Sequence, residues 1–141
     1  MYTMLVAVDG SEHAEHAVRH ALDMARRLAE ARILLVNVQP PVMSGEVSNL
    51  LTAEDVMDQH AEAGRLALAS AKGLLDQAGV AYDTEIAIGR PAETIVDCAL
   101  KSGCDIIIVG ASSRGRVRSI VLGSVASKVV HIAEVPVTVV K

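Results

Sequence analysis

Short apolar runs alternate with longer amphipathic segments along the whole chain. The runs are rich in Val and Ile, and most of them are apolar at nearly every position. Such runs are typical of strands that are buried on both faces of a sheet. The pattern predicts five strands, at residues 2–8, 33–38, 80–88, 105–109 and 135–140.

The segments between these runs carry apolar residues at spacings of three and four, which predicts helices. Ser11 is a suitable N-cap for the first helix, Gly79 suits the end of the second, and Pro91 suits the first turn of the third. The predicted helices span residues 12–29, 54–78, 91–102 and 125–133, and residues 41–53 are predicted to form a connecting loop.

Strands that alternate with helices predict an α/β fold, in which a parallel sheet is covered by helices on both faces. The length of 141 residues fits one domain, residues 1–141. In sheets of this kind, ligands bind outside the carboxyl ends of the strands, where the strand order reverses. The residues that follow the strands are therefore the first candidates for a site.

Two of these strand ends carry suggestive residues. Gly110 ends the apolar run 106–109, and Gly123 and Ser124 open the last helix. Helix N-termini have unpaired N–H groups and partial positive charge, and glycine lets a backbone approach a phosphate or adopt positive φ. Asp9 follows the first strand. These residues predict a phosphate-binding site, although Asp9 and Ser11 fit a plain turn and helix cap equally well.

Composition excludes several functional classes. The net charge is −4 and aromatic residues make up 1% of the chain, which disfavours nucleic-acid binding. No apolar run reaches the ~18 residues of a membrane span, and no signal peptide is expected. Cys98 and Cys104 lack the spacing of a redox motif and predict a reducing compartment, the cytoplasm.

Catalytic and metal-binding motifs are not predicted. The sequence has no nucleophile elbow, no zinc-protease motif and no Walker motif, so no catalytic residue is assigned. His13, His16 and His20 have near-helical spacing, but charged residues flank them, which predicts a solvent-exposed polar face rather than a metal site. The alternating arginines Arg114, Arg116 and Arg118 suit either a solvated loop or a phosphate clamp.

Four segments, in order along the whole chain, resemble the universal stress protein family. They are Val6-Ala7-Val8-Asp9-Gly10-Ser11, Gly89-Arg90-Pro91-Ala92-Glu93-Thr94-Ile95, the stretch from Gly110 to Ser124, and the ending Val135-Pro136-Val137-Thr138-Val139-Val140. The resemblance implies a Rossmann-like universal stress protein fold with strand order 3-2-1-4-5. It also implies a cytoplasmic, dimeric stress-response or regulatory module.

The ATP-binding branch of that family has a signature of glycine, two residues, glycine, nine residues, glycine, then Ser or Thr. Gly110, Gly123 and Ser124 match it, and Ser113 replaces the middle glycine. The resemblance implies that Asp9 contacts the ribose or adenine and that the backbone near Val38 binds adenine. Gly110 would let the chain pass the ribose and phosphates. The amides near Ser113, Gly123, Ser124 and Val125 would hold phosphate, with Mg or another divalent ion held mainly by phosphate oxygens.

Ser113 leaves two alternatives open, because serine adopts positive φ only at a cost. The chain either binds ATP or is a protein-interaction module of the same fold that binds no nucleotide; a slow ATPase is a further alternative. If Ser113 strains the loop, Ser113→Gly is expected to tighten nucleotide binding by on the order of 1 kcal/mol, measured by calorimetric titration. Weaker binding would instead make the Ser113 hydroxyl a phosphate ligand.

The C-terminal strand predicts a homodimer. In the order 3-2-1-4-5, the strand from Val135 to Val140 lies at an edge of the sheet and is apolar on both faces. Free N–H and C=O groups on such an edge favour pairing with another strand, and a two-fold axis makes the pairing self-complementary. Universal stress proteins that this chain resembles dimerise in this way. Thr138 is expected to supply a donor near the centre of the pairing.

Overall fold

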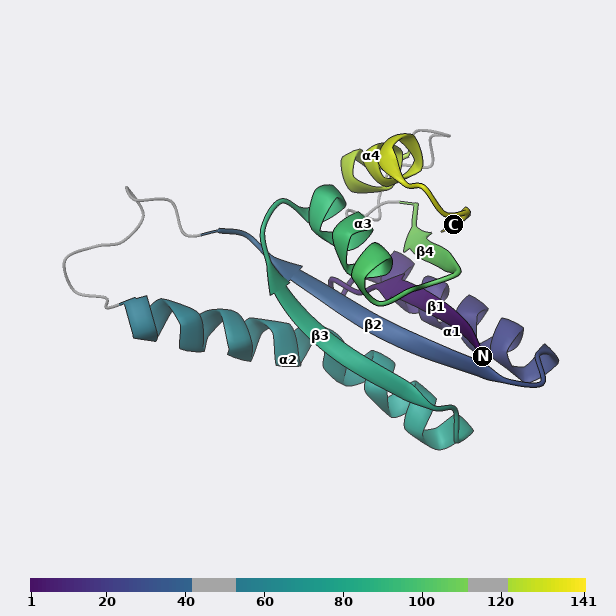
Figure 1. Ribbon diagram of the computed structural model, residues 1–141. Helices are drawn as coiled ribbons and strands as arrows, with labels where there is room; N and C mark the ends of the chain where they lie inside the picture. Colours follow the sequence, from purple (N-terminus) through teal and green to yellow (C-terminus); the bar gives the residue numbers. More distant parts are fainter. Residues whose placement is uncertain (42–52, 112–121) are drawn as a thin grey trace.

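The computed structural model describes residues 1–41, 53–111 and 122–141. Within this part of the chain, five parallel strands form one sheet in the order β3-β2-β1-β4-β5 (Figure 1). The predicted fold class and strand order are therefore confirmed. The strands are β1 (Tyr2–Ala7), β2 (Ala31–Gln39), β3 (Tyr82–Ile88), β4 (Ile106–Gly110) and β5 (Val137–Val140).

Two helices cover each face of this sheet (Figure 1). The helices α1 and α2 pack on one face, and α3 and α4 pack on the other. The described helices are α1 (Glu12–Arg27), α2 (Ala53–Ala78), α3 (Pro91–Lys101) and α4 (Ser124–Ile132). Their positions match the predicted helices to within a few residues.

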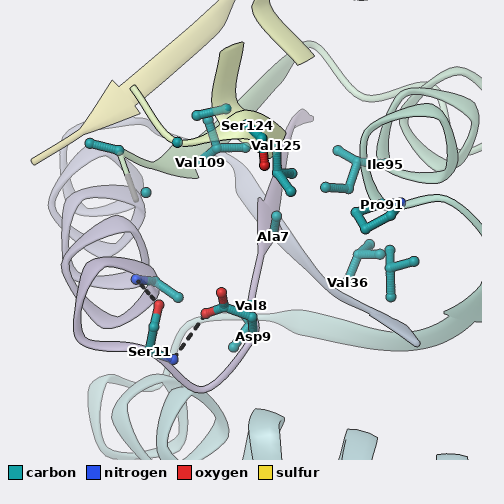
Figure 2. A pocket seen from close by; sticks show the side chains of 16 residues that line it. Ala7, Val8, Asp9, Ser11, Val36, Pro91, Ile95, Val109, Ser124 and Val125 are labelled. Atoms are coloured by element: carbon teal, nitrogen blue, oxygen red, sulfur yellow. Dashed lines mark hydrogen bonds between the residues drawn. The ribbon is translucent and has the colours of Figure 1, made fainter. Parts of the chain in front are cut away.

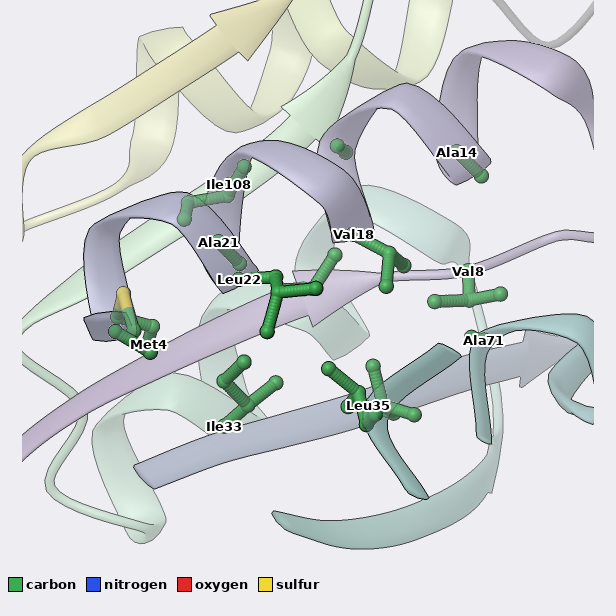
Figure 3. Packing of buried hydrophobic residues seen from close by; sticks show 14 of the residues in the cluster. Met4, Val8, Ala14, Val18, Ala21, Leu22, Ile33, Leu35, Ala71 and Ile108 are labelled. Atoms are coloured by element: carbon green, nitrogen blue, oxygen red, sulfur yellow. The ribbon is translucent and has the colours of Figure 1, made fainter. Parts of the chain in front are cut away.

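The two helical layers enclose separate cores, because successive side chains of a strand point to opposite faces. Met4 and Ile33 pack with Val18 and Leu22 of α1 (Figure 3). Leu5, the neighbour of Met4, belongs to the second core beneath α3 and α4. Burial on both faces is the physical reason why the central strands have almost continuous apolar sequences.

Asn37 is the one fully buried polar side chain in the described ranges, with 3% exposure. Its Nδ2 donates to the carbonyl of Val8 at 2.8 Å, and its Oδ1 accepts from Gln39 Nε2 at 2.7 Å. The bond to Val8 connects the carboxyl end of β1 to that of β2, where the sequence predicts the ligand site, and the bond from Gln39 orients the Asn37 amide. No sequence pattern predicted this role of Asn37.

Asn37→Leu is expected to lower the free energy of unfolding by about 1–3 kcal/mol, because the Val8 carbonyl would stay buried without its donor. Urea unfolding followed by circular dichroism measures the change. Gln39→Ala is the matched control, since it removes only the Gln39–Asn37 bond and leaves the Val8 carbonyl satisfied. An equal loss in both variants would contradict the assignment.

The hydrogen bonds of the edge strand β5 show which of its residues face the free edge of the sheet. The Ile107 N–H in β4 donates to the Pro136 carbonyl at 3.0 Å, and the Ala111 N–H just after β4 donates to the Val140 carbonyl at 2.7 Å. The backbone polar groups of Pro136 and Val140 therefore face β4. Each strand residue points its N–H and C=O to the same side, and successive residues alternate. Thr138 therefore also faces β4, and the choice of Thr138 as an edge donor is wrong. Val137 and Val139 face the free edge.

Candidate functional site

A cavity of about 260 Å³ opens at the carboxyl ends of β1, β2 and β4 (Figure 2). This is the end of the sheet where the sequence predicts a site, because the strand order reverses between β1 and β4. The strands contribute Ala7, Val36, Val38, Val109 and Gly110 to its lining. The rest of the lining comes from residues that follow the strands and from the first turns of α1, α3 and α4.

The predicted site residues that fall in the described ranges all line this cavity: Asp9, Val38, Gly110, Gly123, Ser124 and Val125. Ser113 lies outside the described residues. Residues from the two ends of the chain thus meet at one place, and the roles that the resemblance implies for them stay predictions. Pro91 and Ile95 of α3 also line the cavity, and no sequence pattern predicted them as site residues.

Asp9 and Ser11 form the turn that the simpler interpretation predicted. The Ser11 N–H donates to Asp9 Oδ1 at 2.9 Å, and Ser11 Oγ accepts from the Ala14 N–H at 3.2 Å (Figure 2). Gly10 has a φ of +84°, a conformation that glycine adopts without strain. The turn fixes the Asp9 carboxylate at the edge of the cavity. Among the described residues, no donor contacts its second oxygen, Oδ2.

The helix α4 begins without a side-chain cap. Gly123 is its N-cap residue, and its first helical hydrogen bond runs from the Ser127 N–H to the Gly123 carbonyl at 2.9 Å. The N–H groups of Ser124, Val125 and Ala126 precede that bond, so they have no partner within the helix. By contrast, Ser11 caps α1, and Pro91 at the start of α3 has no N–H. Of the helix starts at the cavity, α4 offers the most free amides.

The backbone conformation at the site glycines differs from the expectation of positive φ. Gly123 has a φ of −59°, and Gly110 is not among the glycines with positive φ. A Cβ added to Gly110 would lie 2.7 Å from the backbone carbonyl carbon of His13. Glycine is therefore required at position 110 for the close packing of α1 on β4, and not for its backbone dihedral angles.

Two of the three histidines of α1 are less exposed than predicted. His13 is half-buried, and its Nδ1 is buried without a hydrogen-bond partner. His16 is also half-buried, and its Nδ1 lies 3.1 Å from the Lys141 carbonyl oxygen. Only His20 has the exposure expected of the polar face among these three residues. The close approach of α1 to β4 and β5 explains the difference.

Both cysteines are free and buried. Burial is the largest cause that raises the pKa of the Cys98 thiol to about 11, followed by the nearby Glu85 carboxylate. Burial also raises the pKa of Cys104. Because the thiolate is the reactive form, neither thiol is activated for nucleophilic or redox chemistry at neutral pH.

The cavity combines three chemical environments. Val36, Val38 and Ile95 form an apolar part that suits a planar ring, Asp9 supplies a carboxylate acceptor, and α4 supplies free amides with partial positive charge. Figure 2 shows Asp9 and Ser11 on one side of the cavity and Ser124 and Val125 on the other. The arrangement can bind a ligand with an apolar ring, hydroxyl groups and an anionic group.

None of the helices in residues 1–41, 53–111 and 122–141 has the length and apolar character needed to cross a membrane.

Comparison with known proteins agrees with this geometry. The universal stress protein family matches residues 1–141. A universal stress protein of Methanocaldococcus jannaschii is 35% identical over 141 residues, covering 98% of this chain and 81% of the relative. The solved structure of another protein of the same organism, MJ0577, superimposes with a TM-score of 0.82 at 28% identity, over 99% of this chain and 95% of that one.

Two solved neighbours contain adenine nucleotides. A universal stress protein of Arabidopsis thaliana with AMP bound has a TM-score of 0.72, and one of Archaeoglobus fulgidus in complex with dAMP has a TM-score of 0.68. The first covers 100% of this chain and 92% of its own, and the second covers 100% and 98%. Each is 24% identical to this chain, a level at which the likeness shows the fold.

Proposed function

Because the chain belongs to the universal stress protein family, we propose that it is a nucleotide-binding regulatory protein and that the cavity at the carboxyl ends of β1, β2 and β4 binds ATP. One observation carries the proposal: the cavity joins an apolar wall and the Asp9 carboxylate to the uncapped start of α4. These features are complementary to a purine, a ribose and a phosphate chain, respectively.

The adenine fits the apolar part between Val36, Val38 and Ile95, where main-chain groups near Val38 give it polar partners. The ribose hydroxyls are then within the range of the Asp9 carboxylate, which can accept their hydrogen bonds. The volume of about 260 Å³ is slightly below the usual range of ligand pockets, which starts at about 300 Å³. A base and sugar fill such a space, and the phosphates extend to the α4 amides.

The phosphates would accept hydrogen bonds from the amides of Ser124 and Val125, and from the Ser124 hydroxyl. These bonds to a charged acceptor are stronger than neutral ones, and the helix dipole adds to the attraction. Mg²⁺ or another divalent ion would be held mainly by phosphate oxygens and water. The Gly110 backbone, which packs on His13, would form the wall beside the ribose and phosphates.

Denaturing the purified protein and analysing the supernatant by mass spectrometry would identify any adenine nucleotide that it carries. Calorimetric titration of nucleotide-free protein with Mg-ATP, ADP, AMP and GTP then measures affinity and base selectivity. Binding of adenine nucleotides with micromolar affinity and weaker binding of GTP are expected. An absence of binding at millimolar ATP would contradict the proposal.

We also propose that two copies pair through β5. The edge-facing N–H and C=O groups of Val137 and Val139 are the free hydrogen-bonding groups of this strand. Pairing about a two-fold axis would extend the sheet across both protomers. The buried, unpaired thiols of Cys98 and Cys104 fit the reducing environment of the cytoplasm, where we expect the protein to act.

A further inference from the structure

An ion pair joins two of the helices that form the cavity. Lys128 Nζ of α4 contacts Glu93 Oε1 of α3. The hydrogen bond from Lys128 is the largest cause that lowers the pKa of the Glu93 carboxyl, so Glu93 is ionised at neutral pH. The Lys128 side chain is 51% exposed and the Glu93 side chain is 40% exposed, so the pair lies at the surface and not in the cavity.

The position of this pair distinguishes it from the other ion pairs. Glu93 lies between Pro91 and Ile95, which line the cavity from α3. Lys128 lies one turn after Ser124, which lines it from α4. Several other ion pairs of the described helices, such as Lys101 with Asp97, connect two positions of one helix and therefore cannot fix the distance between helices.

Apolar packing holds the start of α4, because Val125 and Ala126 pack in the core beneath α3 and α4. Gly123 has no side chain to cap it, and its N–H donates to the Ala111 carbonyl at 2.6 Å. Residues 112–121 precede it outside the described part of the chain. Between the buried Ala126 and Val129 of α4, Lys128 is the charged side chain that reaches a different helix.

We propose that the Glu93–Lys128 ion pair adds to the apolar packing between α3 and α4 and thereby positions the free amides of α4 for an anionic ligand. This inference rests on the proposed nucleotide binding at the same site. Glu93 and Lys128 are positioning residues, and neither contacts the ligand. The alternative is that Lys128 attracts phosphate directly, with Glu93 as a competitor.

The two alternatives predict opposite results for Glu93→Gln. If the pair positions α4, then Glu93→Gln and Lys128→Met weaken ATP binding alike, by about three- to fivefold, the upper range for an exposed ion pair. The double variant is then no weaker than either single variant, because the interaction is already lost. If Lys128 binds phosphate directly, Glu93→Gln releases it and tightens binding, and this result would overturn the proposal.

A second measurement does not depend on any ligand. The Ser127 amide makes the first helical hydrogen bond of α4, so its hydrogen exchange, followed by NMR without nucleotide, reports how firmly the helix start is held. Glu93→Gln and Lys128→Met are expected to accelerate this exchange about three- to fivefold. Unchanged exchange and unchanged affinity in both variants would refute the proposal.

Asp97→Asn and Lys101→Met are the matched controls. They break a more exposed ion pair within α3, and should leave both the affinity and the Ser127 exchange rate unchanged. Equal effects in the controls would attribute the change to net charge and overturn the positioning role. If the wild-type protein binds no adenine nucleotide, the proposed function fails, and the exchange rates alone then decide whether the ion pair positions α4.

Discussion

Gly123→Val is expected to weaken ATP binding by about 100-fold or more while leaving the protein folded. Gly123 has φ −59° and ψ 160°, which any residue can adopt, so valine introduces no backbone strain. Its branched side chain would occupy the space in front of the α4 amides. Losing two hydrogen bonds to a charged phosphate costs roughly 1.5–3 kcal/mol each, and every 1.4 kcal/mol is about tenfold in affinity.

Calorimetric titration with Mg-ATP measures this loss, and thermal unfolding of the free protein tests that the fold is retained. Gly73→Val is the matched control, because a Cβ at Gly73 of α2 would meet nothing within 4 Å and the residue does not line the cavity. It should bind ATP like the wild type. Unchanged affinity of Gly123→Val would mean that phosphate does not bind at the start of α4.

The fold was predictable because its main determinants are local. Runs such as Ile106–Val109 are apolar at every position, as burial on both faces requires, and Ser11, Gly79 and Pro91 mark helix ends by their backbone preferences. The predicted site residues Asp9, Gly110 and Gly123 follow from the same reasoning, because the carboxyl ends of parallel strands must meet at one edge of the sheet.

The features that sequence reasoning missed depend on contacts between distant segments. Asn37 stands in an apolar strand, and nothing local indicates that its amide holds the Val8 carbonyl. The wall from Ile95 and the pairing of Glu93 with Lys128 depend on how α3 and α4 pack. The reason for glycine at position 110 is the approach of α1, which a pattern of strand and loop residues does not contain.

The backbone orientation of single residues in β5 also depends on a contact between distant segments. The prediction that this strand is apolar on both faces is confirmed, since Val137 and Val139 pack under α3 and α4, whereas Val140 packs under α1. It did not assign the backbone, because which N–H groups face the free edge depends on the register with β4. In this register the backbone N–H of Thr138 faces β4 and that of Val139 faces the free edge, so Val139 is the position at which to test the dimer.

Val139→Pro is expected to convert a dimer into a folded monomer. Proline removes the edge-facing N–H of Val139, while the β4-facing carbonyls of Pro136 and Val140 keep their donors. Val139→Ala is the matched control, because it removes the same side-chain packing but keeps the N–H, so it should remain dimeric. Size exclusion with light scattering at tens of micromolar measures the mass, and circular dichroism tests the fold.

A monomeric wild type would contradict the proposed dimer. A Val139→Pro variant that stays fully dimeric would show that the contact between protomers lies elsewhere than on the free edge of β5.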